Sequence, residues 1–355
     1  MITDLITKYG IRQTEKRDIA GMKRKLAMCE SVGLTKGQKS DIQSFYKRVA
    51  GTTVPTYWHE YFYTRNGNFS VNYVPTCFYH KELICRLNDC KLMYAYVDKG
   101  FYDFYFPDIR RPRTIVKNIN GYYYCGDSSI SKAEALEICS NLETAIIKPS
   151  RNSMWGRGVR VISTKDGLYR GESIDMLFSE YGKNFIIQEK VTQHEKMSML
   201  NPTSLNTLRV LSYRHNDEII ILYVIVRIGR AGKTVDNESA GGINADINLD
   251  SGRIIECAYG TPKEKRIYQT DNGTELKDFE IPSVQKVVSM VKDLHLRLPY
   301  FNLIGWDWGI DCYGEPVLIE WNRDPDLSQT AHGPAFGEMT EMIIKDTLKK
   351  KDTRF

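Results

Sequence analysis

Two acidic residues near the C-terminal end of the sequence lie inside apolar segments. Asp307 lies within the predicted strand 303–311 and Glu320 within the strand 316–322, with a turn between them. An unpaired carboxylate in such a strand is costly, and facing carboxylates repel each other. A divalent cation such as Mg²⁺, which prefers oxygen ligands, removes both costs. Asn322 would lie on the same face of the strand as Glu320. The pattern predicts a metal-binding face of Asp307, Glu320 and Asn322, and a solvated outer strand with ordinary polar residues is the alternative.

A lysine at the end of another predicted strand is followed by a loop rich in serine and glycine. The strand 145–149 contains Lys148, and the loop to the next strand, 159–162, contains Gly156 and Gly158. Exposed backbone N–H groups at such a loop can wrap phosphate oxygens, and a lysine adds a point charge. A plain hairpin is the alternative, because the loop is not a Walker A sequence and no GxGxxG follows a strand.

Two arginines are expected on neighbouring strands. Arg209 lies in the predicted strand 206–214 and Arg227 in the returning strand 219–228. Antiparallel pairing would bring their guanidinium groups close together, and two such groups imply a shared anion. Pairing with local acidic residues is an equally supported alternative.

The composition is typical of a globular protein. The 355 residues are 42% hydrophobic and 26% charged, which suits one large domain or about two to three small ones. No apolar run is long enough to span a membrane and no signal peptide is evident, so we predict a cytoplasmic protein. The eight cysteines lack metal-ligand spacing and are interpreted as free thiols of a reducing compartment. The net charge of +5 is compatible with anionic ligands and does not specifically indicate nucleic acid.

The N-terminal part must support these candidate groups. Amphipathic helices are predicted over 16–31 and 36–50, and the aromatic-rich segment 53–80 is interpreted as core. The candidate buried positions of the two helices are Met22, Leu26, Met28, Ile42, Phe45 and Val49. Strand candidates at 91–97 and 114–116, with a helix before them, favour an α/β N-terminal unit. Further along, Ser131 and Glu134 predict a capping box that begins a helix.

Taken together, these segments resemble the ATP-grasp superfamily from about Val97 to Asp326. Lys99 is similar to the family's first ATP lysine, and Lys148 to its second. The segment 153–159 is similar to the phosphate-covering loop, and 187–191 to the interdomain hinge that holds adenine. Asp307, Glu320 and Asn322 are similar to the metal triad. Four further segments resemble the sugar-transfer-associated group of this superfamily: Gln193-His194, Asn206 to Arg209, Asp236-Asn237 with Gly241-Gly242, and Gly305 to Asp307.

The resemblance implies a fold class and a division of the chain. The fold would be the α/β (α+β) ATP-grasp fold, in which two α+β subdomains clasp ATP. We divide the chain into an N-terminal helical and α/β region (1–95), a small lid subdomain with the Gly loop (96–190), a large subdomain with the metal site (191–345) and a basic C-terminal tail (346–355). Trp321 departs from the small residue expected between the ligands, and the ribose-binding residue has only Glu195 and His194 as candidates.

The resemblance also implies a reaction. Such ligases use Mg²⁺ and ATP to phosphorylate a carboxylate, and an amine then attacks the acyl-phosphate to form an amide. The expected partners are therefore a small-molecule carboxylate and a small-molecule amine, such as an amino acid or a sugar-linked compound. The sugar-transfer-associated group belongs to surface-polysaccharide gene clusters, which implies a role in making or modifying such polymers. A kinase acting on a hydroxyl, or a non-catalytic scaffold on the same fold, is the alternative.

Each candidate residue has an implied role in that reaction. Asp307, Glu320 and Asn322 would bind Mg²⁺, and Arg209 and Arg227 would stabilise the transferred phosphoryl group or the acyl-phosphate. The expected ATP-binding residues are Lys99, Lys148, Ser153, Gly156, Arg157, Gly158, Gln188, Glu189 and Val191.

Overall fold

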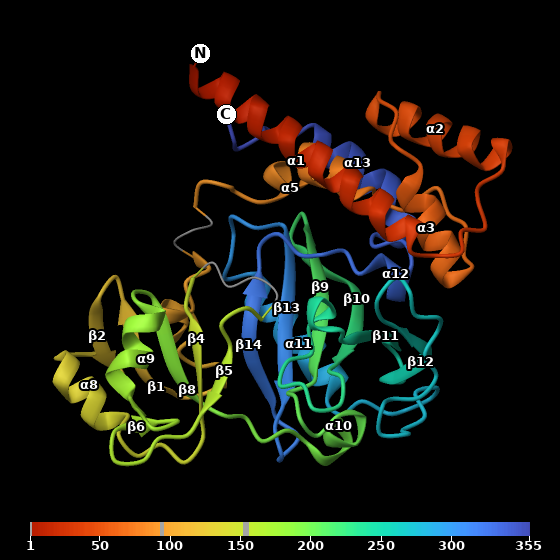
Figure 1. The fold of residues 1–355 in the computed structure, drawn as a ribbon. Helices are drawn as coiled ribbons and strands as arrows, with labels where there is room; N and C mark the ends of the chain where they lie inside the picture. The colour runs from red at the N-terminus through yellow and green to blue at the C-terminus, as the bar shows by residue number, and fades with distance from the viewer. Residues whose placement is uncertain (1, 93–95, 152–155) are drawn as a thin grey trace.

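The structure consists of two six-stranded antiparallel sheets that lie side by side, with a group of N-terminal helices above the larger one (Figure 1). It is a computed structural model that describes residues 2–92, 96–151 and 156–355. The class is mixed α+β, as the sequence predicts. No helix within the described residues combines the length and the apolar character that a membrane span requires.

The smaller sheet is built from a continuous stretch of the chain. Its spatial order is β3-β2-β1-β8-β4-β5. The strands are β1 (Thr114–Ile119), β2 (Tyr122–Cys125), β3 (Ser128–Ile130), β4 (Ala145–Pro149), β5 (Arg160–Ile162) and β8 (Phe185–Glu189). Helices α8 (Lys132–Ile138) and α9 (Ile174–Tyr181) supply its core, and the ribbon β6 (Leu168–Tyr169) with β7 (Glu172–Ser173) lies beside them. The predicted capping box of Ser131 and Glu134 is confirmed at the start of α8.

The larger sheet has the order β12-β11-β10-β9-β13-β14. The strands are β9 (Thr207–His215), β10 (Glu218–Ile228), β11 (Ile243–Asn248), β12 (Arg253–Tyr259), β13 (Leu303–Ile310) and β14 (Pro316–Asn322). Helix α11 (Val284–His295) packs on one face, and α10 (Glu195–Leu200) and α12 (Gln329–His332) border the sheet. His295 is a core residue, and Ser212 Oγ and the Phe301 carbonyl contact its two ring nitrogens at 2.8 and 2.9 Å.

The other face of the larger sheet is covered by helices from both ends of the chain. The N-terminal helices are α1 (Ile2–Ala27), α2 (Lys36–Ala50), α3 (Tyr57–Asn66), α4 (Thr76–Phe78), a π-helical turn (Tyr79–Leu83) and α5 (Ile84–Leu87). The C-terminal helix α13 (Thr340–Leu348) packs among them. The aromatic segment is core as predicted, with Trp58, Tyr61, Phe62, Tyr73, Phe78 and Tyr79 buried.

Two predictions for the N-terminal third are wrong. Among the described residues before Thr114 there are helices and turns but no strand, so this region is helical rather than α/β. Of the strand candidate 91–97, residues 91, 92 and 97 lie in turns, Tyr96 has a helical backbone, and 93–95 lie outside the described residues. The local apolar pattern at this point is satisfied by packing Tyr96 against Tyr105 and Phe301 rather than by strand pairing.

The interpretation of all eight cysteines as free thiols is also wrong. Cys85, the second residue of α5, forms a disulfide with Cys90, because the turn after the helix brings their Cα atoms to 5.6 Å. The other six cysteines are free thiols. Met28 likewise lies outside the core, since 49% of it is exposed.

The C-terminal tail packs against the N-terminal helices. Thr353 donates its Oγ1 hydrogen to the Cys85 carbonyl at 2.8 Å and accepts from the Cys90 N–H at 3.0 Å. Arg354 binds the buried Asp352 and the carbonyls of His80 and Lys81. The last residues therefore complete the helical layer.

Candidate active site

The β13–β14 hairpin places the three predicted metal ligands together. Asp307 pairs directly with Glu320, and Gly305 pairs with Asn322, so the side chains of Asp307, Glu320 and Asn322 share one face. Asn322 Nδ2 donates to Asp307 Oδ2 at 3.1 Å. Trp321 points to the opposite face, where its ring packs 5.0 Å from that of Phe301 in the core.

Asp307 is also the anion that the two arginines share. Arg209 donates from Nε and Nη2 to the two carboxylate oxygens at 2.6 and 2.8 Å, and Arg227 Nη1 lies 3.3 Å from Oδ1. Burial opposes the charge of Asp307, but Arg209 and Arg227 outweigh it and lower its pKa to about 2. Of the two alternatives, the arginines thus pair with a local acidic residue in this structure.

The carboxylate face fits a divalent cation. Asp307 and Glu320 are adjacent oxygen donors, and the ammonium group of Lys99 lies 2.9 Å from Glu320 Oε2. Lys99 thus compensates Glu320, as Arg209 and Arg227 compensate Asp307, so cations already lie beside both carboxylates. Carboxylate and amide oxygens are the ligands that Mg²⁺ prefers, so the donor set is suitable for this ion.

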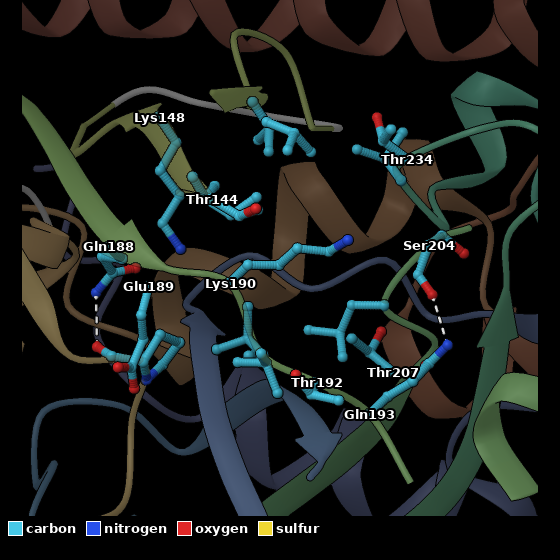
Figure 2. A pocket seen from close by; sticks show the side chains of 18 of the residues that line it. Thr144, Lys148, Gln188, Glu189, Lys190, Thr192, Gln193, Ser204, Thr207 and Thr234 are labelled. Atoms are coloured by element: carbon cyan, nitrogen blue, oxygen red, sulfur yellow. Dashed lines mark hydrogen bonds between the residues drawn. The ribbon is translucent and has the colours of Figure 1, made fainter. Parts of the chain in front are cut away.

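A cavity of about 740 Å³ lies between the two sheets and is lined by residues of both. Lys148 of β4 points into it beside Gln188 (Figure 2). Burial and the nearby Lys99 lower the pKa of Lys148 to about 8, against the opposing influence of Glu320. Lys99 is held next to β4 because its N–H donates to the Ser150 carbonyl at 3.0 Å. Two lysines thus meet two carboxylates in one cavity, whose volume suits a nucleotide-sized ligand.

The strand β8 and the residues after it form one wall of the cavity. Gln188 donates from Nε2 to the Pro112 carbonyl at 3.2 Å and to Thr114 Oγ1 at 3.1 Å. The Glu189 N–H donates to the Arg113 carbonyl at 3.0 Å, and Val191 also lines the cavity. These contacts fix the position of the segment that links the two sheets (Figure 2).

The predicted residues do not all lie in the cavity wall. The lining includes Lys99, Lys148, Gly156, Gln188, Glu189, Val191, Arg227, Asp307 and Glu320. Arg209 and Asn322 contact Asp307 from beside the lining, while Arg157 and Gly158 are exposed outside it. Ser153 lies outside the described residues. Neither ribose candidate lines the cavity, and His194 caps α10 by accepting from the Lys196 N–H at 3.1 Å.

The sequence did not reveal Asp236 as a buried carboxylate of this cavity. Asp236 Oδ2 accepts from the Thr207 N–H at 3.0 Å and from its hydroxyl. Burial raises the pKa of Asp236 to about 6, although Arg227 and Thr207 lower it. The sequence signals were its place in the polar segment 236–242 and the resemblance of Asp236-Asn237 to the sugar-transfer-associated group, and neither indicated burial.

The Gly loop touches this same segment. Gly156 has a φ of +70°, and a Cβ built on it would lie 2.5 Å from Asn237 Oδ1. A residue with a side chain would be both strained and obstructed here. The backbone at Gly156, between β4 and β5, therefore approaches Asn237 closely, and both residues line the cavity.

Comparison with known proteins gives a family match over most of the chain. A model of the family described as sugar-transfer associated ATP-grasp matches residues 80–343. No curated protein matches.

Similar solved structures include D-alanyl-alanine synthetase A from Vibrio cholerae O1, at 13% identity and a TM-score of 0.41 over 71% of this chain and 64% of that chain. The L-amino acid ligase from Bacillus licheniformis is 11% identical, with a TM-score of 0.40 over 73% and 49%. The ligase PsnB in complex with a minimal precursor, Mg and ADP is 15% identical, with a TM-score of 0.40 over 74% and 62%. This chain therefore spans less than two thirds of each, and the likeness concerns the fold alone.

Proposed function

The chain belongs to the sugar-transfer associated ATP-grasp family, and on this premise we propose that it is a Mg²⁺- and ATP-dependent carboxylate–amine ligase. The observation that carries the proposal is the convergence of Lys99 and Lys148 with Asp307 and Glu320 around one cavity. Cations for phosphate oxygens and oxygen ligands for Mg²⁺ are the two sets of groups that phosphoryl transfer requires.

The proposed reaction has two steps. A substrate carboxylate oxygen attacks the γ-phosphorus, the bond to ADP breaks, and an acyl-phosphate forms. The amine nitrogen then attacks the acyl carbon, phosphate leaves with its bridging oxygen, and the nitrogen loses a proton to give the amide. Mg²⁺ bound at Asp307, Glu320 and Asn322 would neutralise charge on the phosphates.

The side chains of this protein would position the reactants. Lys148 and Lys99 bind phosphate oxygens, and Lys99 exchanges its contact with Glu320 for a phosphate contact when the metal binds. Gln188, Glu189 and Val191 hold the adenine against the linking segment. Arg227, at the edge of the cavity, stabilises the transferred phosphoryl group, and Arg209 positions Asp307. Alignment and charge neutralisation then supply most of the rate enhancement.

We further propose that the product belongs to surface-polysaccharide biosynthesis or modification, in line with the family description. The requirement for ATP places this reaction in the cytoplasm. The amine and the carboxylate are small molecules such as an amino acid and a sugar-linked acid or amino sugar.

The test is release of ADP and phosphate with Mg·ATP and a panel of amino acids, uronic acids and amino sugars. Glu320→Gln is expected to reduce turnover by about a hundredfold or more, because it removes a charged metal ligand from the reacting centre. Glu315→Gln is the matched control, because Glu315 lies in the turn of the same hairpin and pairs with Lys286 away from the cavity.

Different outcomes identify the alternatives. Phosphate retained on the acceptor, with none free in solution, would show a kinase. Binding of Mg·AMPPNP without turnover of any acceptor would show a scaffold. Absence of Mg·AMPPNP binding by the wild-type protein would refute ATP-dependent function altogether.

Gly156→Ala provides a separate test of the Gly loop. The substitution is expected to weaken Mg·AMPPNP binding by about tenfold, because the new methyl group collides with Asn237 and favours a negative φ. Isothermal titration calorimetry measures the affinity. Gly126→Ala is the control, since Gly126 also has a positive φ (+58°) but nothing lies within 4 Å of its added Cβ. Equal affinities of the two variants would contradict this role of the Gly loop.

A further inference from the structure

A second, smaller cavity of about 60 Å³ lies next to the candidate active site. The segment 236–238 separates the two, because Asp236 and Asn237 line the larger cavity and Glu238 lines the smaller one. The other walls come from the N-terminal helices, from β11 and from the segment after β14. The residues that matter below are Lys25, Glu238, Asn244 and Asp326.

Paired residues of the larger sheet lead from the candidate active site to the smaller cavity. Arg227 of β10 pairs with Asn244 of β11, so both side chains lie on the same face, on strands about 4.8 Å apart. Arg227 Nη1 in turn lies 3.3 Å from Asp307 Oδ1. The face therefore runs from the carboxylate pair through Arg227 to Asn244. Arg227 lines the larger cavity and Asn244 lines the smaller one, so the two cavities lie beside neighbouring side chains of one face.

The charged side chains that line the smaller cavity are two carboxylates and one lysine. Glu238 and Asp326 contribute carboxylates, and Asn244 Oδ1 is buried with no hydrogen-bond partner among the described residues. Lys25 is the one lining residue with a positive charge, and its Nζ lies 3.6 Å from Glu238 Oε1. Burial lowers the pKa of Lys25, but Glu238 and Asp326 outweigh it and the net shift is upward. The cavity thus favours positive charge.

We infer that this cavity binds the amine substrate through its protonated amino group, which donates to Asn244 Oδ1 and to the carboxylates of Glu238 and Asp326. An ammonium group has three donors and no acceptor, which matches these oxygens. The volume accommodates a head group of this size with its first carbons. The inference rests on the proposed ligase activity. In this arrangement the anionic reactants bind in the larger cavity beside Arg227, and the cationic amine binds in the smaller cavity.

The test compares two variants that are expected to change the affinity for the amine in opposite directions. Ethanolamine and D-glucosamine are titrated against the Mg·AMPPNP complex, each beside its neutral counterpart, ethylene glycol or D-glucose, with ligand-observed NMR as the readout. At least one amine is expected to bind more tightly than its counterpart. Glu238→Gln should lower the affinity for that amine by about tenfold, because a charge-assisted hydrogen bond is lost. Lys25→Met should raise the affinity for the same amine, because a competing cation is removed.

The controls and contrary results are equally specific. Lys23→Met, on the same helix, and Glu256→Gln, on β12, should leave amine affinity unchanged, because neither residue lines the cavity. Weaker amine binding in both Lys25→Met and Glu238→Gln would indicate a purely structural ion pair and overturn the inference. So would the absence of any preference for amines while Mg·AMPPNP still binds. Absence of Mg·AMPPNP binding would instead overturn the proposed function.

Discussion

Arg209→Met is expected to destabilise the protein by about 3–5 kcal/mol and to abolish turnover, because it leaves the Asp307 carboxylate buried without its main partner. Both side chains are almost fully buried, with 4% of each residue exposed, and the pair is bidentate. Arg227 remains, but at 3.3 Å and with one nitrogen it replaces only part of the lost interaction. Urea denaturation measures the stability change, and release of ADP measures turnover.

The double variant Arg209→Met/Asp307→Leu separates stability from chemistry. Apolar residues can replace a buried ion pair at little cost in stability, so the double variant should regain most of what the single variant loses. Its turnover should remain absent, because a metal ligand is missing. Arg297→Met is the matched control, since Arg297 forms an equally bidentate pair with Asp108 at the surface. Exposed pairs contribute little, and an equal loss of stability in this control would contradict the argument.

The pH dependence of the ion pair has a definite sign. The pKa of Asp307 is lowered to about 2 in the folded state, whereas an unfolded aspartate titrates near 3.9. The stabilisation is therefore complete above about pH 5 and is lost as the pH falls through 2. In acid denaturation, the wild-type protein should show the loss of stability caused by protonation of Asp307, and the double variant should lack it.

The second large effect is expected at Lys148. Its pKa is lowered to about 8 by burial and by Lys99, so a substantial fraction is neutral just above neutral pH. Bound phosphate oxygens would favour the charged form. Mg·AMPPNP binding at pH 8–9 should therefore take up protons, and affinity should fall as the pH rises through 8. Calorimetry in two buffers of different ionisation enthalpy measures the uptake.

Lys148→Met should weaken Mg·AMPPNP binding by about tenfold to a hundredfold, because a charged hydrogen bond to phosphate is lost. It should also remove the proton uptake. Although ligand binding weakens, the free energy of unfolding of the ligand-free variant should be higher than that of the wild type at pH 7. Since unfolded lysine titrates near 10.4, the wild-type protein gains stability between pH 8 and 10.4, whereas the variant should lack this rise and be more stable at pH 7.

Lys165→Met is the control for these experiments, since Lys165 is exposed and does not line the cavity. It should leave affinity and proton uptake as in the wild type. Proton uptake that persists in Lys148→Met would assign the titration to another group.

The sequence predicted those parts of the site that depend on local pattern. The β13–β14 hairpin follows from two apolar runs around a turn, and direct pairing of Asp307 with Glu320 follows from its register. That Asp307 is the anion for Arg209 depends on the pairing of β13 with β9, which joins residues far apart in the chain. No local pattern encodes this pairing. The burial of Asp236 has the same origin, because its partners Thr207 and Arg227 come from other strands.

The errors have comparable causes. The apolar segment around Tyr96 alternates like a strand, but the Tyr96 ring is partly buried by contacts with Tyr105 and Phe301 instead. The Cys85–Cys90 disulfide depends on where α5 ends, since only a turn after Leu87 brings the two residues together. Cysteine spacing alone does not contain that information.

The packing of the N-terminal helices with α13 affects the order in which parts of the chain can fold during synthesis. The smaller sheet uses only residues 114–189 and can form as soon as they have left the ribosome. The N-terminal helices emerge first, yet their apolar sides pack on β9, β10, β13 and α13, which are made much later. The contacts of Thr353 and Arg354 with the N-terminal helices need residues that follow α13. We therefore expect the N-terminal helices to acquire their native contacts after the smaller sheet has formed, with their aromatic residues accessible to chaperones until β13 and α13 have been made.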